Sequence, residues 1–77
     1  MMNSDTAWES RVKAVLKAEL KRRDVTYGQL AAELKKLGVD ETPENIANKI
    51  SRGKFTAVFL FQCLDAIGCK SIVISID

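Results

Sequence analysis

The 77-residue sequence has a net charge of +2, with 47% hydrophobic and 29% charged residues, which is the composition of one folded domain and not of a disordered chain. It contains no histidine, no phosphate-cradling glycine loop, no nucleophile motif and only two cysteines, and no run is long enough for a membrane span or a signal peptide. We therefore expect a cytoplasmic protein that is not an enzyme and has no cofactor, metal ion, membrane partner or small-molecule substrate.

The first predicted helix follows a short tail, residues 1–5, which we expect to be disordered. Thr6 to Glu9 has the T-x-x-E form of a capping box, which predicts a helix running to about Arg23. A basic row at four-residue steps occupies one side of this helix and consists of Lys13, Lys17 and Lys21. The simpler interpretation of this row is a solvated face, and contact with phosphate or with a protein partner is the alternative.

One acidic residue of the first helix, Glu19, falls among its apolar side chains when the helix is projected at about 100° per residue. A carboxylate in that position is costly unless it has a partner. We therefore expect Glu19 to contact an arginine or a lysine, and the leading candidates are Arg52 and Lys49.

A second helix is predicted after a tight connection at Asp24 and Val25. Thr26 to Gln29 is a capping box of the form T-x-x-Q, and the helix that it opens stops at Gly38. With the helix that follows, this one forms a helix-turn-helix arrangement. In such a pair the second helix enters a DNA groove, and the first lies across the DNA backbone.

The third predicted helix lies within residues 42–54. Thr42 suits the N-cap, Pro43 suits the first helical position, and Gly53 suits the left-handed residue after the last turn. Within one arc of about 100° the helix presents Asn45, Asn48, Lys49 and Arg52. Asparagine, lysine and arginine reach base edges and phosphates in a DNA major groove. The segment therefore predicts a recognition helix, although a solvated face on an ordinary small helix has the same pattern.

A fourth helix is predicted from Ala57 to about Ile67, with Thr56 as its N-cap and Gly68 as its end. Only two of its side chains are polar, so we expect it to need burial on nearly every side, whereas the three preceding helices can cover only about half of it. Cys63 falls in this apolar run and is expected to be a core residue. The second cysteine, Cys69, falls in the following turn and is expected to be a partly exposed thiol without a particular role.

The C-terminal segment, residues 69–77, alternates apolar and polar residues as a β-strand does. No other segment is a credible strand, and a lone strand leaves its backbone hydrogen bonds unpaired. We therefore expect it to pair with the same strand of a second subunit about a twofold axis. The residues expected at this homodimer interface are Val58, Phe61, Ile72, Ile74 and Ile76.

Several of these residues resemble the helix-turn-helix domains of phage repressor and Cro-like proteins. The resemblance rests on Thr26-x-x-x-Leu30-Ala31, followed by a capped helix that ends Ile50-Ser51-Arg52-Gly53-Lys54. A closer resemblance is to a group of small bacterial proteins of unknown function in that superfamily, and it covers about residues 8–68. Its features here are Trp8, Leu20–Arg23, Val25–Tyr27, Leu30, Gly38–Val39 and Asn48–Phe55.

The resemblance implies an all-α, lambda-repressor-like domain of four helices over residues 6–68 that binds double-stranded DNA as a homodimer and regulates transcription. Thr26 and Tyr27 would start the supporting helix and touch phosphate. The residues facing DNA would be Asn45, Asn48, Lys49 and Arg52, with Lys54 supplying further charge. Asn45 and Asn48 carry amide groups able to read adenine edges.

Other features favour an alternative function, a helix-turn-helix-derived protein-interaction module that does not bind DNA. The net charge is low, and the glutamates Glu41 and Glu44 sit at the start of the predicted recognition helix. The span between the two helices is also longer than in the usual repressor motif. In this alternative, the lysine row or the apolar face with Val58 and Phe61 would hold the partner. Structured RNA is a third possibility, but the sequence offers no aromatic platform for it.

Overall fold

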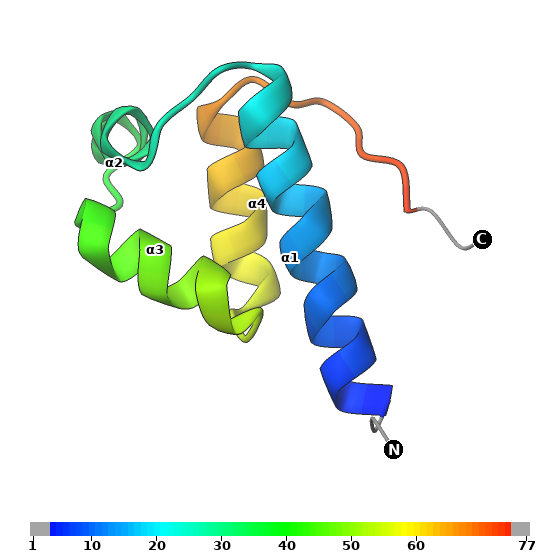
Figure 1. Cartoon of the computed structure of the whole chain (residues 1–77). Helices are drawn as coiled ribbons and strands as arrows, with labels where there is room; N and C mark the ends of the chain where they lie inside the picture. The colour runs from blue at the N-terminus through cyan, green and yellow to red at the C-terminus, as the bar shows by residue number, and fades with distance from the viewer. Residues whose placement is uncertain (1–3, 75–77) are drawn as a thin grey trace.

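Four α-helices make up the computed structural model, which describes residues 4–74 (Figure 1). The helices are α1 (Ser4–Arg22), α2 (Tyr27–Lys36), α3 (Pro43–Arg52) and α4 (Ala57–Ala66). α1 packs against α3 and α4, and α2 packs against the same two helices. Among the described residues, no helix is both long enough and apolar enough to cross a bilayer. The predicted all-helical architecture with four helices is confirmed.

The N-caps of α2, α3 and α4 are the residues predicted from the sequence. The Thr26 hydroxyl accepts a hydrogen bond from the Gln29 backbone N–H at 3.1 Å, and the Gln29 side chain accepts one from the Thr26 N–H at 2.9 Å. Thr42 and Thr56 each accept a hydrogen bond from the backbone N–H three residues further on. These contacts satisfy N–H groups that have no partner within the helix.

The first helix begins earlier than the capping-box pattern predicts. α1 starts at Ser4, so Thr6 lies within the helix and is not its N-cap. Residues 4–6 include no proline or glycine that would keep the helix from extending past this point. The part of the predicted tail that precedes Ser4 lies outside the described residues.

The predicted C-terminal strand is not present in the described part of the segment. Residues 69–74 have no regular secondary structure, and the remainder of the predicted strand, with Ile76, lies outside the described residues. A strand expected to pair with a second subunit has no ladder partner within one chain, because its N–H and C=O groups need another strand alongside.

The core lies between the four helices and is almost entirely apolar. Its buried apolar residues are Leu16, Leu20, Leu30, Leu34, Ile46, Ile50, Phe59, Cys63, Leu64 and Cys69. Cys63 is fully buried, as predicted, and burial raises the pKa of its thiol to about 12. This thiol therefore stays protonated at neutral pH, where it acts as a small apolar side chain and not as a nucleophile.

Candidate nucleic-acid interface

α3 has one buried side and one exposed side. Ile46 and Ile50 are fully buried, and they anchor the helix in the core. The exposed residues of α3 beyond its first residue, Pro43, are Glu44, Asn45, Asn48, Ser51 and Arg52. Within the part of the chain that the structure describes, the side chains of Asn45, Asn48 and Arg52 have no hydrogen-bond or ion-pair partner. Three of the four predicted DNA-facing residues of α3 therefore share one accessible surface.

Lys49, the fourth predicted residue, instead contacts the protein itself. Its ammonium group forms an ion pair with Glu41, in the link that precedes α3, and lies 4.6 Å from the centroid of the Phe59 ring. The Lys49 side chain is 41% exposed and that of Glu41 only 11%. This pair neutralises the charge of Glu41. Of the two glutamates near the start of α3, only Glu44 therefore keeps an exposed negative charge.

The C-terminal end of α3 rests directly on α1. Gly53 ends the helix in a left-handed conformation (φ 68°), and a Cβ atom at this position would lie 2.5 Å from the Glu9 carbonyl oxygen. Beside it, the Lys13 ammonium donates to the Ser51 carbonyl at 3.1 Å, and Lys54 lies 3.5 Å from the Glu9 carboxylate. These contacts fix the end of α3 from which Arg52 projects.

The structure places Thr26 and Tyr27, which were predicted to touch phosphate, at the start of α2. Thr26 is exposed and caps the helix, whereas Tyr27 is half-buried and packs against the core. Together with Lys17 and Lys21 they line a shallow hollow of about 300 Å³. Sequence reasoning did not place these two lysines here, because the angle between α1 and α2 is set by the tertiary fold.

The link between α2 and α3 is longer than the turn of a typical helix-turn-helix unit. It runs from Leu37 to Thr42, six residues between Lys36 and Pro43, where three or four are usual. The two helices nevertheless pack against each other. The length follows from the helix ends themselves, because Gly38 closes α2 (φ 82°) and Thr42 caps α3.

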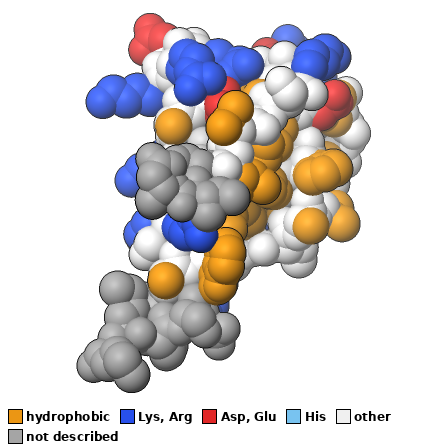
Figure 2. Space-filling model, turned by 90° about the vertical axis from the view of Figure 1, so that its right-hand side faces the viewer, with side chains coloured by type: hydrophobic (Ala, Val, Ile, Leu, Met, Phe, Trp, Pro, Cys, Tyr) orange, Lys and Arg blue, Asp and Glu red, His pale blue; other side chains and the backbone are white. Residues whose placement is uncertain are grey.

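A second surface, which we call the apolar face, covers parts of α1, α4 and the C-terminal segment (Figure 2). We define it by the apolar side chains of Trp8, Val58, Leu60, Phe61, Ile72 and Ile74. On α4, Val58 is 65% exposed and Phe61 is 70% exposed, so the other helices of the chain cover only part of α4, as the sequence predicts. Among the described helices, only α1 and α2 pack closely against α4. The predicted interface residues Val58, Phe61 and Ile74 are exposed, Ile72 is half-buried, and Ile76 lies outside the described residues.

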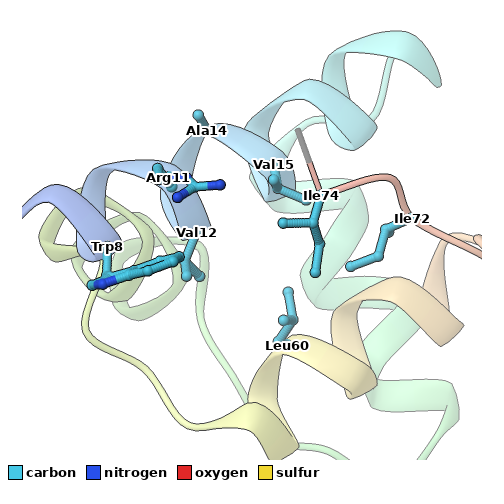
Figure 3. Close-up of a pocket in the computed structure, with 8 residues that line it drawn as sticks. All are labelled: Trp8, Arg11, Val12, Ala14, Val15, Leu60, Ile72 and Ile74. Atoms are coloured by element: carbon cyan, nitrogen blue, oxygen red, sulfur yellow. The ribbon is translucent and has the colours of Figure 1, made fainter. Parts of the chain in front are cut away.

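The apolar face contains a groove of about 290 Å³ between α1 and α4 (Figure 3). The side chains of Ile72 and Ile74 point toward Leu60 across this groove. At the other end, Trp8 is 56% exposed, and the Arg11 guanidinium lies 4.4 Å from the centroid of its ring. The groove is thus open and lined almost wholly by apolar side chains, which is typical of a surface that contacts another molecule.

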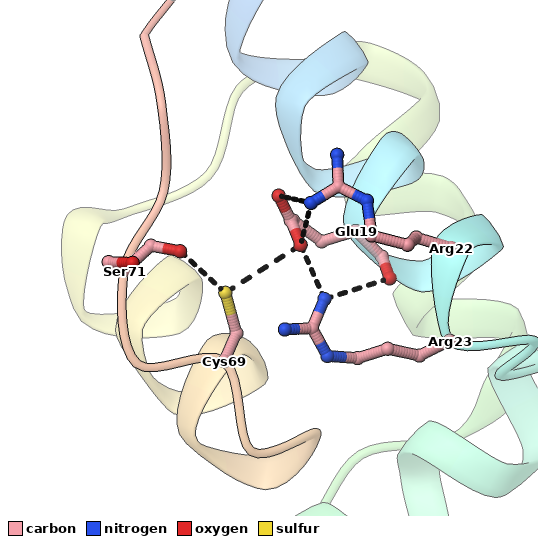
Figure 4. A network of polar contacts seen from close by, with 5 residues as sticks. All are labelled: Glu19, Arg22, Arg23, Cys69 and Ser71. Carbon is pink, nitrogen blue, oxygen red and sulfur yellow. Dashed lines mark hydrogen bonds and ion pairs between the residues drawn. The ribbon is translucent and has the colours of Figure 1, made fainter.

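A polar network anchors the start of the C-terminal segment to α1 (Figure 4). Glu19 is buried and forms ion pairs with Arg22, at 3.2 Å, and with Arg23. The expected basic partner is therefore present, but it is neither Arg52 nor Lys49. Residues three and four positions further along a helical turn lie on the same face, so Glu19 finds one partner on its own helix and the other directly after the end of that helix.

Cys69 joins this network from the other side. Its thiol lies 3.7 Å from a Glu19 carboxylate oxygen and 3.1 Å from the Ser71 carbonyl oxygen, and its single proton can be donated to only one of them at a time. The prediction of a partly exposed thiol without a role is wrong, because Cys69 is buried. The backbone turns inward at this point, where the Cys69 N–H donates to the Leu64 carbonyl at 2.8 Å.

Stability is expected to fall in acid as Glu19 becomes protonated. The hydrogen bond from Arg23 lowers the pKa of Glu19 below its usual value of 4.5, against the opposing effect of burial. The pKa of Glu19 is lower in the folded state than in the unfolded chain, so the ionised Glu19 carboxylate stabilises the fold. This stabilisation is fully present above about pH 4.5 and is lost as the pH falls through the pKa of the folded state. Urea unfolding from neutral pH down to about pH 3 measures this loss. In the Glu19→Gln variant, the free energy of unfolding should change less with pH over this range. If its pH dependence is the same as that of the wild type, the loss of stability in acid comes from other carboxylates.

Comparisons with known proteins give one match. The model of a family described as a domain of unknown function, DUF6471, matches residues 8–72. No curated protein and no solved structure gives a significant match. The matched span includes α2, α3 and α4, nearly all of α1, and the anchored start of the C-terminal segment.

Proposed function

We propose that this chain, which belongs to the DUF6471 family, is a DNA-binding domain of the lambda-repressor and Cro-like helix-turn-helix type that regulates transcription. In this proposal α3 enters the major groove, and α2 lies across the DNA backbone. The observation that carries it is the outer face of α3, where Asn45, Asn48 and Arg52 are exposed and have no side-chain partner among the described residues. Amide groups pair with adenine edges, and a guanidinium pairs with guanine or phosphate.

The way in which α3 is held supports this function. Its apolar side is buried in the core, and its C-terminal end rests on α1 through Gly53 and Ser51. A recognition helix that is fixed before binding loses little conformational freedom when it meets DNA. Lys54 is exposed just beyond this helix, at the same end, and lies 3.5 Å from the Glu9 carboxylate. In this arrangement Lys49 positions the helix and does not contact a base.

We further propose that the apolar face joins two copies into a homodimer. Val58 and Phe61 on α4 would contact their counterparts about a twofold axis, with the C-terminal segments, including Ile72 and Ile74, paired alongside. Exposed apolar patches of this kind mark interaction surfaces. A dimer would present two copies of α3 to two half-sites, as helix-turn-helix proteins commonly do.

The dimer is tested by placing a charge in the middle of the apolar face. Phe61→Glu is expected to give a monomer at micromolar concentration, because a carboxylate cannot be buried against an apolar partner surface without a large penalty. Sedimentation velocity measures the change. Ala32→Glu, at an exposed position on α2, is the matched control and should leave the dimer intact. A wild-type monomer would overturn the dimer proposal, and a dimeric Phe61→Glu variant would place the interface elsewhere.

The DNA-binding proposal is tested by selecting from random duplexes with purified protein and then comparing two variants. Asn48→Ala should weaken binding to the enriched motif about tenfold, or about 1.4 kcal/mol, with little effect on other sequences, because it removes a base contact. Lys54→Ala should instead weaken binding to all sequences and flatten the salt dependence. Equal, sequence-independent losses from both variants would indicate non-specific binding.

A protein-interaction module that does not bind DNA is the second candidate function. The observation that favours it is the open groove of about 290 Å³ in the apolar face, beside the exposed Trp8. The exposed Glu44 on the outer face of α3 also disfavours phosphate there. A selection that enriches no duplex, together with an apolar face that remains uncovered in a monomer, would favour this function over DNA binding.

A further inference from the structure

The lysine row of α1 consists of Lys13, which holds the last turn of α3, and of Lys17 and Lys21, for which the proposed function names no contact. With a rise of 1.5 Å per residue, the row extends over about 12 Å of helix, and its four-residue steps keep it on one side. Lys17 and Lys21 are exposed. Neither of them forms an ion pair with any of residues 7–74.

Both ends of the lysine row adjoin the helix-turn-helix unit. At one end, the Lys13 ammonium donates to the Ser51 carbonyl in the last turn of α3 at 3.1 Å. At the other end, Lys17 and Lys21 share a hollow with Thr26 at the start of α2. α1 therefore carries positive charge from the C-terminal end of α3 to the N-terminal end of α2, where the helix dipole is also positive.

Neither of the glutamates of α1 opposes this charge with a free carboxylate. Glu9 lies 3.5 Å from Lys54, and Glu19 is buried against Arg22 and Arg23. A free carboxylate beside the lysines would form an ion pair with them and neutralise their positive charge. Lys17 and Lys21 therefore keep exposed ammonium groups with no ion pair to any of residues 7–74, on the helix on which α3 rests.

We infer that Lys17 and Lys21, continued by Lys13, bind the phosphate backbone of the same duplex that α3 contacts. One DNA strand carries a phosphate for every 3.4 Å of helix axis, so a row of about 12 Å can face about three phosphates. Lysine suits such contacts, because its ammonium acts as a point charge on a flexible stem. The inference rests on the proposed DNA-binding function and adds to it a sequence-independent contact from outside the helix-turn-helix pair.

The test compares salt dependence for two variants of equal charge. Lys17→Gln/Lys21→Gln removes two charges from the row, and Lys35→Gln/Lys70→Gln removes two exposed charges elsewhere. The slope of log K against log salt should become shallower by about 0.9 for each lost phosphate contact, and so by about 1.8 for the first variant. The change should be the same on the selected motif and on a random duplex. The control variant should keep the wild-type slope.

The outcomes separate this inference from the function on which it rests. If the wild-type protein binds no duplex even at low salt, both are overturned. If it binds, and the Lys17→Gln/Lys21→Gln variant keeps the wild-type slope, the inference alone is overturned. An equal change of slope in the control variant would also overturn it, because the effect would then come from net charge. Circular dichroism should show the same helix content in both variants, since all four positions are exposed.

Discussion

Replacing Gly53 by alanine is expected to lower the free energy of unfolding by about 3 kcal/mol, because two penalties act at the same position. The left-handed conformation (φ 68°) costs a residue with a Cβ about 1–2 kcal/mol. The new Cβ would also lie 2.5 Å from the Glu9 carbonyl oxygen, a backbone atom that cannot rotate away. Either α3 or α1 must shift, and overpacking of this kind typically costs about 1–3 kcal/mol.

Gly38→Ala is the matched control for this variant. Gly38 is also left-handed (φ 82°), but a Cβ there would have no neighbour within 4 Å. The Gly38→Ala variant should therefore lose only the roughly 1–2 kcal/mol of unfolding free energy that the left-handed conformation costs a residue with a Cβ. Thermal unfolding of both variants measures the difference, since 1 kcal/mol corresponds to about 4–8 °C in a domain of this size. Equal melting temperatures would mean that α3 does not rest on α1 as described.

Lys49→Ala is expected to destabilise the fold by about 2 kcal/mol. The substitution leaves the Glu41 carboxylate, only 11% exposed, without its partner, and it removes the ammonium group from above the Phe59 ring. The expected cost is below that of breaking a fully buried pair, because the Lys49 side chain is partly exposed and solvent screens the interaction. Chemical denaturation of the variant measures the cost.

Two comparisons show whether this cost comes from the ion pair. In a Glu41→Gln background, Lys49→Ala should cost less, and a double-mutant cycle gives the coupling between the two side chains. Arg52→Ala, on the exposed side of the same helix, should change stability by less than about 0.5 kcal/mol while weakening DNA binding. If Lys49→Ala and Arg52→Ala have the same effect on stability, Lys49 does not have the structural role assigned to it.

The helix ends could be predicted from sequence because their causes are local. Thr26 and Gln29 satisfy each other's backbone across three residues, and Thr42 and Thr56 act over the same distance. No tertiary contact is needed for such caps to form. Periodicity likewise identified the buried side of α3, because Ile46 and Ile50 repeat at helical spacing.

The errors concern contacts between segments that are distant in sequence or not helical. Lys49 lies at the edge of the exposed arc, and its direction depends on Glu41, in a link whose path no periodic pattern reveals. Cys69 is buried because the chain turns back toward α1 after α4, fifty residues after Glu19. By contrast, the exposure of Phe61 in a single chain was predicted, because the sequence offers too few helices to cover an almost wholly apolar α4.

The side chains that hold α3 in place differ from those that it presents outward. Ile46, Lys49 and Ile50 attach the helix to the domain, whereas the side chains at positions 45, 48 and 52 form no hydrogen bond or ion pair with the rest of the described chain. Evolution can therefore exchange the outward set freely without endangering folding. Under the proposed function, the residues of α3 that would contact DNA can therefore change while the residues that attach α3 to the domain stay the same.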